Sequence, residues 1–220
     1  MNIEPVAYFR SPLKEKFGIP RQSGLAPDLR GEVCFVAPYD APEAVRGLEG
    51  FDYCWLVWGF SLNPAAPASL TVRPPRLGGN ERVGIFASRS PFRPNPLGLS
   101  CVRIESVRPG VIEVSGADLA DNTPIYDVKP YVEYADSRPG VRGGFVDTAS
   151  WESLEVEIPE LIARELGPRD AAALSEVLAQ DPRPRYQEDP ERLYGLVFGG
   201  FNVKFSVQNG KVFVHSLEKY

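Results

Sequence analysis

The sequence predicts a mainly β protein, with a β-rich domain that forms a sheet or barrel followed by a small α+β domain. Short alternating apolar segments fill the first part of the chain and are separated by Gly, Pro, Asn and Asp turn signals. Strands do not alternate with helices there, which argues against a parallel α/β fold. A helical apolar pattern appears only towards the C-terminus, where it marks the second domain.

The expected elements of the first domain follow from their apolar patterns. The stretch at 39–50 predicts a short helix, with Asp40 as its N-cap and Gly47 or Gly50 at its end. The segment "FDYCWLVWGF" at 51–60 is too continuously apolar for an edge and predicts a central strand. Further strands are expected at 5–9, 31–37, 82–86, 97–107, 111–119 and 125–132.

The segment "RSPFRPNPLGLS" at 89–100 is stiff and cationic. Its three prolines fix their own φ and push the preceding residues out of the helical region, so an ordered loop between the strands at 82–86 and 97–107 is expected. Such a loop holds side chains in fixed directions, which suits a binding site on a rigid scaffold. A surface turn with solvated arginines is the alternative. The side chains concerned are Arg89, Ser90, Arg93 and Asn95.

A Gly-, Pro- and Ser-rich stretch, "YADSRPGVRGGFVDTAS", has the composition of a linker. It places the domain boundary between Asp136 and Ser150, with a first domain over 1–140 and a second over 150–220.

The second domain is expected to contain a strand at 151–158, a helix at 168–180 and a C-terminal hairpin. The turn Asn209-Gly210 is the strongest short-range hairpin signal in the chain. His215 alternates with Phe213 and Leu217 on the second strand of that hairpin, which favours a packing role over a catalytic one. The apolar face of the helix is expected to consist of Ala172, Leu174, Val177 and Leu178.

Composition excludes several classes of protein. With 220 residues, 43% hydrophobic and 24% charged, the chain is typical of a globular protein. No run approaches the roughly 18 apolar residues of a membrane span, and the first residues lack the pattern of a signal peptide, so we expect a cytoplasmic protein with no membrane contact. The cysteines Cys34, Cys54 and Cys101 lie in apolar segments, and one histidine cannot complete a zinc site. We therefore expect buried thiols and no metal.

Charge is distributed unevenly along the chain. The net charge is −5, yet 71–93 holds five arginines against Glu81 alone. The stretch "FRSPLKEKFGIPRQSG" adds four cations against Glu15. Two basic loops on an acidic protein indicate local contact with an anionic ligand or RNA. Arginines scattered over a solvated surface are the alternative.

Six blocks of sequence lie in order along the chain. They are "RSPLKEKFGIPRQSGL", "APYDAPEAVRGLEGF", "TVRPPRLGGNERVGIFASRSPFRPNPLGLS", "DLADNTPIYDVKPY", "LAQDPRPRY" and "FNVKF". Together they resemble the bacterial TrmO (YaeB/TsaA-like) family of tRNA methyltransferases, from about Val6 to the C-terminal hairpin.

The resemblance implies a fold and an activity. It implies an S-adenosyl-L-methionine-dependent enzyme built on a closed antiparallel β-barrel, which acts as a homodimer on the anticodon loop of tRNA. The implied reaction methylates the exocyclic nitrogen of threonylcarbamoyladenosine just 3′ of the anticodon. Because S-adenosylmethionine carries an activated methyl group, such an enzyme chiefly aligns its reactants and needs neither a metal nor a covalent nucleophile.

The resemblance also implies site residues. Arg89 is the candidate to bind the carboxylate of the cofactor, and the remaining cofactor contacts would come from Gly24, Leu25, Ser61, Leu62, Asp118 and Leu119. A proton must leave the accepting nitrogen, and its candidate acceptors are Asp118, Asp121, Tyr126 and Asp127. The candidate tRNA contacts are Lys14, Lys16, Arg73, Arg76, Arg93, Asn95 and Lys129, with Arg93, Lys129 or Arg76 meeting the carboxylate of the modified base.

Two other classes of function are compatible with these residues. One is a methyltransferase with the same cofactor and another substrate. The other is a non-enzymatic RNA-binding regulatory barrel that uses the basic loops alone.

Overall fold

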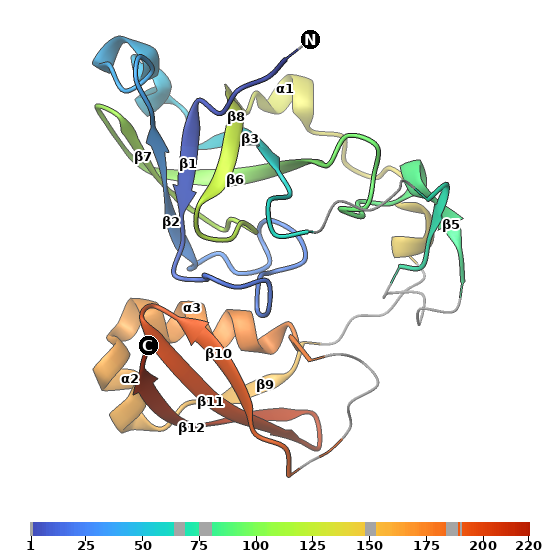
Figure 1. Cartoon of the computed structure of the whole chain (residues 1–220), viewed down its shortest axis with the longest axis vertical. Coiled ribbons are helices and arrows are strands. Elements are labelled where there is room, and N and C mark those ends of the chain that lie inside the picture. Colours follow the sequence, from blue (N-terminus) through green and yellow to red (C-terminus); the bar gives the residue numbers. More distant parts are fainter. Residues whose placement is uncertain (1, 64–68, 75–80, 148–152, 184–188, 190) are drawn as a thin grey trace.

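The N-terminal half of the chain closes into a six-stranded antiparallel barrel (Figure 1). The computed structural model describes residues 2–63, 69–74, 81–147, 153–183, 189 and 191–220. The barrel order is β1-β2-β7-β6-β3-β8. These strands are β1 (Ala7–Arg10), β2 (Arg30–Phe35), β3 (Tyr53–Gly59), β6 (Leu97–Arg108), β7 (Val111–Ser115) and β8 (Thr123–Pro130). The closed barrel and the expected β-rich fold class are confirmed.

Strand β3 has the central position that its apolar sequence predicts, because it pairs with β6 on one side and β8 on the other. Its alternate residues Cys54, Leu56 and Trp58 are buried in the barrel core. On β6 the leucines face outward, although a strand with alternating apolar residues would be expected to bury them. Leu97 and Leu99 are 37% and 59% exposed on the outer face, while the small residues that follow each of them, Gly98 and Ser100, are buried.

The expected helix at 39–50 is wrong. The structure has two separate 3₁₀ turns, η1 (Pro42–Val45) and η2 (Leu48–Gly50). Ala41, not Asp40, precedes the first turn, and no side chain caps it. Gly47 adopts a φ of 90° between the turns, a conformation that interrupts a right-handed helix.

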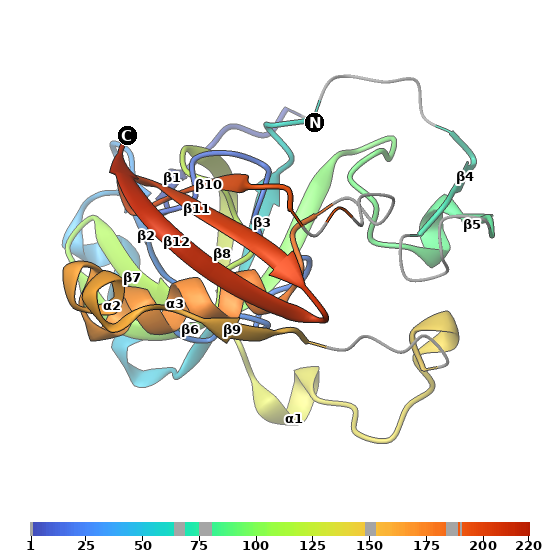
Figure 2. The ribbon, with the colours of Figure 1, turned by 90° about the horizontal axis from the view of Figure 1, so that it is seen from below.

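The strand expected at 82–86 is also largely wrong. Only β5 (Val83–Gly84) is extended, and it pairs with β4 (Thr71–Val72) in a two-stranded ribbon beside the barrel (Figures 1 and 2). The chain then enters a 3₁₀ turn, η4 (Ile85–Ala87). The proline-rich segment 89–96, which we call the elbow, therefore connects this ribbon to β6 instead of joining two barrel strands.

The C-terminal part is a four-stranded sheet with two helices. Its order is β10-β11-β12-β9, in which β9 (Glu155–Glu157) pairs parallel to β12. The other elements are α2 (Glu160–Leu166), α3 (Pro168–Ala179), β10 (Tyr194–Phe198), β11 (Phe201–Gln208) and β12 (Lys211–Lys219). Short elements also occur in the preceding linker, namely α1 (Glu133–Asp136) and η5 (Gly144–Val146).

The predicted hairpin across Asn209-Gly210 is confirmed, with φ of 50° and 74° at the two turn residues, as a type I′ turn requires. Helix α3 is also confirmed, although its buried face uses Ala173 where the sequence suggested Ala172. A second hairpin turn at 199–200, between β10 and β11, and helix α2 were not foreseen.

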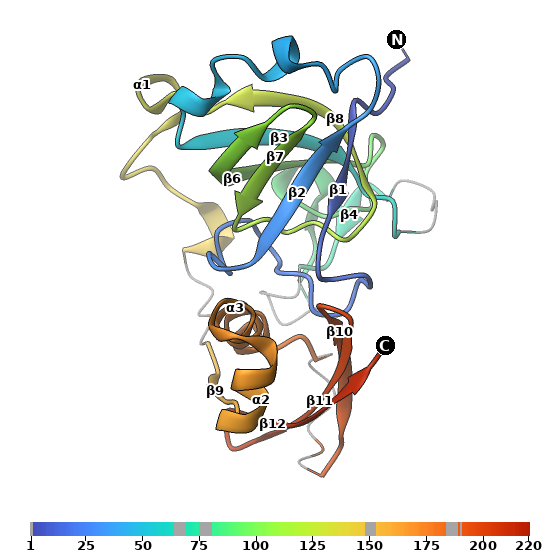
Figure 3. The ribbon, with the colours of Figure 1, turned by 90° about the vertical axis from the view of Figure 1, so that its left-hand side faces the viewer.

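The two halves of the molecule share a segment. The connection between β1 and β2, which we call loop 11–29, lies between the barrel and the C-terminal sheet (Figures 1 and 3). Its residues Leu13, Ala26 and Leu29 are at most 2% exposed and belong to the C-terminal core, together with Leu174 of α3. The C-terminal core is therefore completed by residues from the first domain.

Gly98 is predicted to be intolerant of any side chain. A Cβ there would lie 2.2 Å from Cε2 of the Trp58 indole, a rigid ring in the barrel core. Gly98→Ala should lower the free energy of unfolding in urea by about 1–3 kcal/mol through overpacking. Gly84→Ala is the matched control, since its φ is −57° and no atom lies within 4 Å of the new methyl group. Equal stability of the two variants would contradict this packing.

Candidate active site

Three connections meet at one end of the barrel. They are loop 11–29, the elbow and the turn 116–122 between β7 and β8. The Gly24 N–H donates to the Gly116 carbonyl at 2.8 Å, and the Gly116 N–H donates to the Leu29 carbonyl at 3.0 Å. Gly24 and Gly116 have φ of 81° and 77°, and a Cβ on Gly116 would lie 3.6 Å from the Gly24 backbone. The site is thus framed by a close approach of two glycine backbones.

Asp118 is the half-buried carboxylate of this site. Its Oδ1 accepts a hydrogen bond from the Ser100 hydroxyl, and the backbone N–H of Ser23 also donates to its carboxylate. Burial raises the pKa of Asp118, while the Ser100 hydroxyl, its own backbone N–H, the Arg89 charge and the Ser23 N–H oppose this rise. A carboxyl group with a raised pKa near an exposed cation is the kind of group that binds or accepts a proton at a functional site.

The two arginines of the elbow have different environments. Arg89 is exposed and donates to the side-chain oxygen of Gln22 in loop 11–29. Arg93 is half-buried, and its Nη1 donates to the backbone carbonyls of Ser88 at 3.1 Å and Ser90 at 3.5 Å. Arg93 therefore braces the elbow, whereas Arg89 extends from it towards the site.

Lys16 joins loop 11–29 to two other parts of the site. Its ammonium donates to the Asn63 side chain, just after the expected cofactor contacts Ser61 and Leu62. It also lies 5.6 Å from the centre of the exposed Phe92 ring in the elbow. Lys14, two residues earlier, lies 5.8 Å from the Tyr220 ring at the other domain's C-terminus. The structure thus brings Lys16 to the site and places Lys14 at the domain junction.

The other expected cofactor contacts line the same end of the barrel. Ser61 and Leu62 are exposed and follow β3 directly. The Tyr126 ring packs where Gly59 ends that strand, and its hydroxyl would lie 2.9 Å from a Cβ on Gly59. Leu119 is 1% exposed with its side chain in the barrel core, so it can offer a ligand only its backbone.

Two of the candidate proton acceptors have other partners. Asp127 forms an ion pair with Lys129 at 2.8 Å. Asp127 and Lys129 pair with Val57 and Trp55 of β3, the positions that alternate with its core residues, so both lie on the outer face of the barrel. Asp121 accepts the Ser11 N–H at 3.0 Å and holds the start of loop 11–29.

The remaining candidate tRNA contacts are peripheral. Arg73 and Asn95 are exposed, the first beside β4 and the second in the elbow. Arg76 lies outside the described residues.

Four residues of the site were missed by sequence reasoning. They are Trp58, Ser100, Gln22 and Ser23, which contact Asp118 or Arg89 directly or through one hydrogen bond. Ser100 gives no usable signal in the sequence, because Leu97 and Leu99 suggest the opposite facing of β6 and would turn Ser100 outward.

The C-terminal domain holds the loop that frames the site. The Gly199 N–H donates to the Pro12 carbonyl at 3.1 Å, and Glu176 of α3 accepts the Asp28 N–H at 2.8 Å. Phe17 stacks on Phe205 of β11 with 6.4 Å between ring centres. Loop 11–29 is therefore anchored on both sides, and the second domain contributes to the geometry of the first domain's site.

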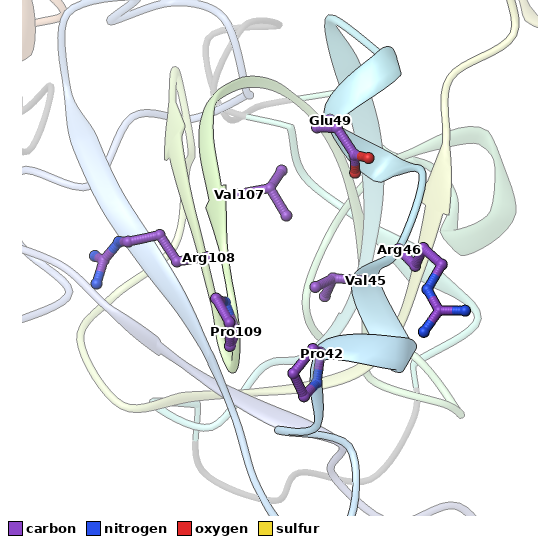
Figure 4. A pocket seen from close by; sticks show the side chains of 7 residues that line it. All are labelled: Pro42, Val45, Arg46, Glu49, Val107, Arg108 and Pro109. Atoms are coloured by element: carbon purple, nitrogen blue, oxygen red, sulfur yellow. The ribbon is translucent and has the colours of Figure 1, made fainter.

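Other parts of the molecule are weaker candidates for a functional site. An open pocket of about 290 Å³ lies between η1, η2 and the β6–β7 turn (Figure 4). It is lined by Val45, Val107 and Arg108 among others, at the end of β6 opposite Ser100. His215 contacts Ser206 at 2.8 Å on the C-terminal sheet, which agrees with a structural role.

The described residues contain no group of three or more His, Cys, Asp or Glu side chains that could hold a metal. Cys54 is buried, and burial raises the pKa of its thiol to about 12, while Cys34 and Cys101 are only half-buried, against expectation. Across the same residues, none of the helices combines the length and apolar character needed to cross a membrane.

Two family models match almost the whole chain. The model of the tRNA-methyltransferase O N-terminal domain matches residues 8–137, and that of the TrmO C-terminal domain matches residues 152–220. The chain belongs to the TrmO family. A relative from Escherichia coli K12, named tRNA (adenine(37)-N6)-methyltransferase, is 38% identical and covers 98% of this chain and 97% of its own length.

Two further comparisons agree with this assignment. A protein from Pseudomonas aeruginosa, named as a putative S-adenosylmethionine-dependent methyltransferase, is 44% identical over 89% of this chain and 87% of its own length. A crystal structure of TrmO from the same species has a TM-score of 0.83 and 35% identity, and covers 99% of this chain and 98% of that one. The expected family and fold are thus confirmed.

The dual anchoring of loop 11–29 predicts that cofactor binding depends on the C-terminal core. Leu13→Ala should cost about 2–5 kcal/mol of stability and also weaken cofactor affinity, because Leu13 ties the loop to that core. Leu174→Ala is the matched control, since it removes an equally buried leucine of the same core from a helix. Isothermal titration calorimetry, at a temperature where both variants are folded, should show a weaker Kd for Leu13→Ala alone. Equal affinities would contradict the coupling.

Proposed function

We propose that this protein uses S-adenosyl-L-methionine to methylate tRNA at the exocyclic nitrogen of threonylcarbamoyladenosine, just 3′ of the anticodon. The observation that carries the proposal is the half-buried Asp118 in the field of the exposed Arg89, at a barrel mouth framed by the Gly24 and Gly116 backbones. Family membership supports tRNA adenosine methylation, since the relatives are named tRNA (adenine(37)-N6)-methyltransferases.

The residues at the barrel mouth fit the cofactor. Its carboxylate suits the exposed Arg89 guanidinium, and its cationic groups suit the neighbourhood of the Asp118 carboxylate. The backbones of Gly24, Leu25 and Leu119, with Ser61 and Leu62, would hold the rest of it. When bound, S-adenosylmethionine supplies an activated methyl group. The chain therefore has to bind and orient the reactants and accept one proton.

Asp118 is the proton acceptor that the structure supports best among the candidates. It combines partial burial, a raised pKa and the influence of the Arg89 charge, whereas Asp127 is paired with Lys129 on the outer face. Tyr126 of β8, whose ring packs against the end of β3, is close enough to the site to orient the base. In this role Asp118 takes the proton from the accepting nitrogen, and the electron pair of that N–H bond stays on nitrogen.

Basic residues around the mouth would bind the phosphates of the anticodon loop. Lys16 is the best placed of them, since it contacts both Asn63 and the Phe92 ring beside the site. The other proposed contacts are Lys14, Arg73, Arg76, Arg93, Asn95 and Lys129.

Incubation with labelled cofactor and total tRNA, followed by nucleoside analysis, tests the proposal and distinguishes it from the two alternatives. A methyltransferase of another substrate leaves the tRNA unlabelled, and a pure RNA-binding barrel does not bind the cofactor.

Arg89→Ala should weaken cofactor binding by about ten- to a hundredfold, because a hydrogen bond to a charged group contributes roughly 1.5–3 kcal/mol. Binding of tRNA should change much less. Arg82→Ala is a suitable control, since Arg82 is also exposed but contacts Thr71 on the ribbon at 3.2 Å. Unchanged cofactor affinity in folded Arg89→Ala would remove Arg89 from the site.

The threonylcarbamoyl group should be required for methylation. It adds a carboxylate and a hydroxyl, and a site built to pair with such groups rejects a substrate that lacks them. Unmodified tRNA should bind through its phosphates, yet show a kcat/KM lower by about a hundredfold or more. Enzymatic addition of the group to the same tRNA should restore activity, and Arg93→Ala should reduce this restoration by a larger factor than it weakens cofactor affinity, which depends on Arg93 only through its bracing of the elbow. Equal methylation of both tRNAs would exclude this substrate.

We also propose that the protein is a homodimer. The outer face of β6 exposes Leu97 and Leu99, an apolar surface suited to a second copy. Leu99→Glu should shift the protein to monomers in sedimentation equilibrium, while Val141→Glu, the same kind of change at an exposed linker position, should not. A wild-type protein that is monomeric at high micromolar concentration would refute the proposal.

A further inference from the structure

A chain of hydrogen bonds connects the barrel core to Asp118. The indole Nε1 of Trp58 on β3 donates to the Ser100 hydroxyl on β6 at 2.9 Å, and that hydroxyl donates to Oδ1 of Asp118. Trp58 is 6% exposed and Ser100 is fully buried. Bulk water therefore does not compete for these groups, and each bond is stronger than it would be on the surface.

The direction of this chain is fixed by chemistry. An indole N–H can only donate, so Ser100 must accept from Trp58. A serine hydroxyl has one proton, which is then left for the carboxylate of Asp118. Oδ1 of Asp118 is thus held as an acceptor, and a hydrogen bond donated to it favours the ionised form of the carboxyl group.

Packing holds the first member of the chain in place. The Trp58 ring occupies the space that a side chain on Gly98 would need, at 2.2 Å from its Cβ position. Phe60 packs edge-on against it with 4.4 Å between ring centres. The indole cannot turn away without opening the barrel core, so the hydrogen bond to Ser100 is preorganised.

We propose that Trp58 and Ser100 are positioning residues that hold Asp118 ionised and oriented to accept the proton of the methyl-accepting nitrogen. This inference rests on the proposed function, in which Asp118 is the proton acceptor. Neither residue touches the reacting atoms, and both act through the orientation and charge state of Asp118.

The groups that face Asp118 determine how its pKa would change if the Ser100 hydroxyl were removed. Arg89 faces it from the elbow, the Ser23 N–H from loop 11–29, Ser100 from β6, and its own backbone N–H from the turn. All four favour the ionised form, and burial opposes it. Because the pKa of Asp118 is already raised by burial, removal of the Ser100 hydroxyl should raise it further and extend the protonated form to higher pH.

The test compares Ser100→Ala, Trp58→Phe and wild type in two measurements. The first is the titration of the Asp118 carboxyl carbon by ¹³C NMR in Asp-labelled protein without cofactor, assigned with Asp118→Asn. The second is the pH profile of kcat/KM on tRNA. Ser100→Ala should titrate at higher pH and lose about ten- to a hundredfold in kcat/KM on the acidic limb, with a smaller loss at alkaline pH. Trp58→Phe should act in the same direction but less, because Ser100 can still donate.

Two further variants serve as controls. Trp55→Phe removes the other indole donor of β3, which bonds the exposed Asp136 at 3.2 Å, and should change neither measurement. Ser100→Cys retains a weak donor of similar size and should fall between wild type and Ser100→Ala. A uniform loss of activity at every pH, with the Asp118 titration unmoved, would overturn the positioning role. If instead wild type fails to methylate any tRNA while the titration shifts as expected, the proposed function is wrong and the hydrogen-bond chain stands.

Discussion

The anchoring of loop 11–29 in two cores is the constraint on which the geometry of the candidate site depends. The loop contains glycines, prolines and polar residues, and fixing each of its residues costs roughly 1–2 kcal/mol of backbone entropy. Leu13 and Leu29 offset part of this cost, since burying one leucine contributes about 1.5–3 kcal/mol. Those leucines are buried in the C-terminal core, while Ser23 and Gly24 bond to the turn at 116–118. The second domain thus stabilises a loop whose functional groups face the first.

Asp118 accepts hydrogen bonds from both the anchored loop 11–29 and the barrel. A buried carboxylate is costly unless donors surround it. One donor comes from a strand (Ser100) and another from the loop (Ser23), so both the barrel and the loop stabilise its charge, together with the backbone N–H of Asp118 itself and the Arg89 charge. The raised pKa shows that desolvation outweighs these donors. The barrel therefore holds a charge that its interior does not favour, which is typical of groups kept for chemistry rather than stability.

Sequence reasoning reached the features that depend on local pattern. The apolar run at 51–60 correctly predicted strand β3, and the Asn209-Gly210 turn correctly predicted the final hairpin. Both succeeded because burial and turn type depend on only a few neighbouring residues. The helix at 39–50 failed because Gly47 enters the left-handed region and divides the segment into two turns. The contact between Trp58 and Ser100 could not be predicted, because it depends on the register of β3 against β6, which joins residues 42 positions apart. Likewise, no local signal shows that Leu13 packs with α3.

The two arginines of the elbow have different structural roles. Its stiffness does not come from proline alone, because Arg93 closes onto the carbonyls of Ser88 and Ser90, and the Ser90 hydroxyl accepts the Phe92 N–H at 3.2 Å. This self-bracing leaves Arg89 as the side chain that reaches Gln22 and the neighbourhood of Asp118. A guanidinium has five N–H donors, so Arg93 can brace the loop through Nη1 and still meet an anion through its other nitrogens. An anion bound there would tighten the same loop that holds Arg89. Recognition of the substrate carboxylate and retention of the cofactor would then be coupled through one short segment of backbone.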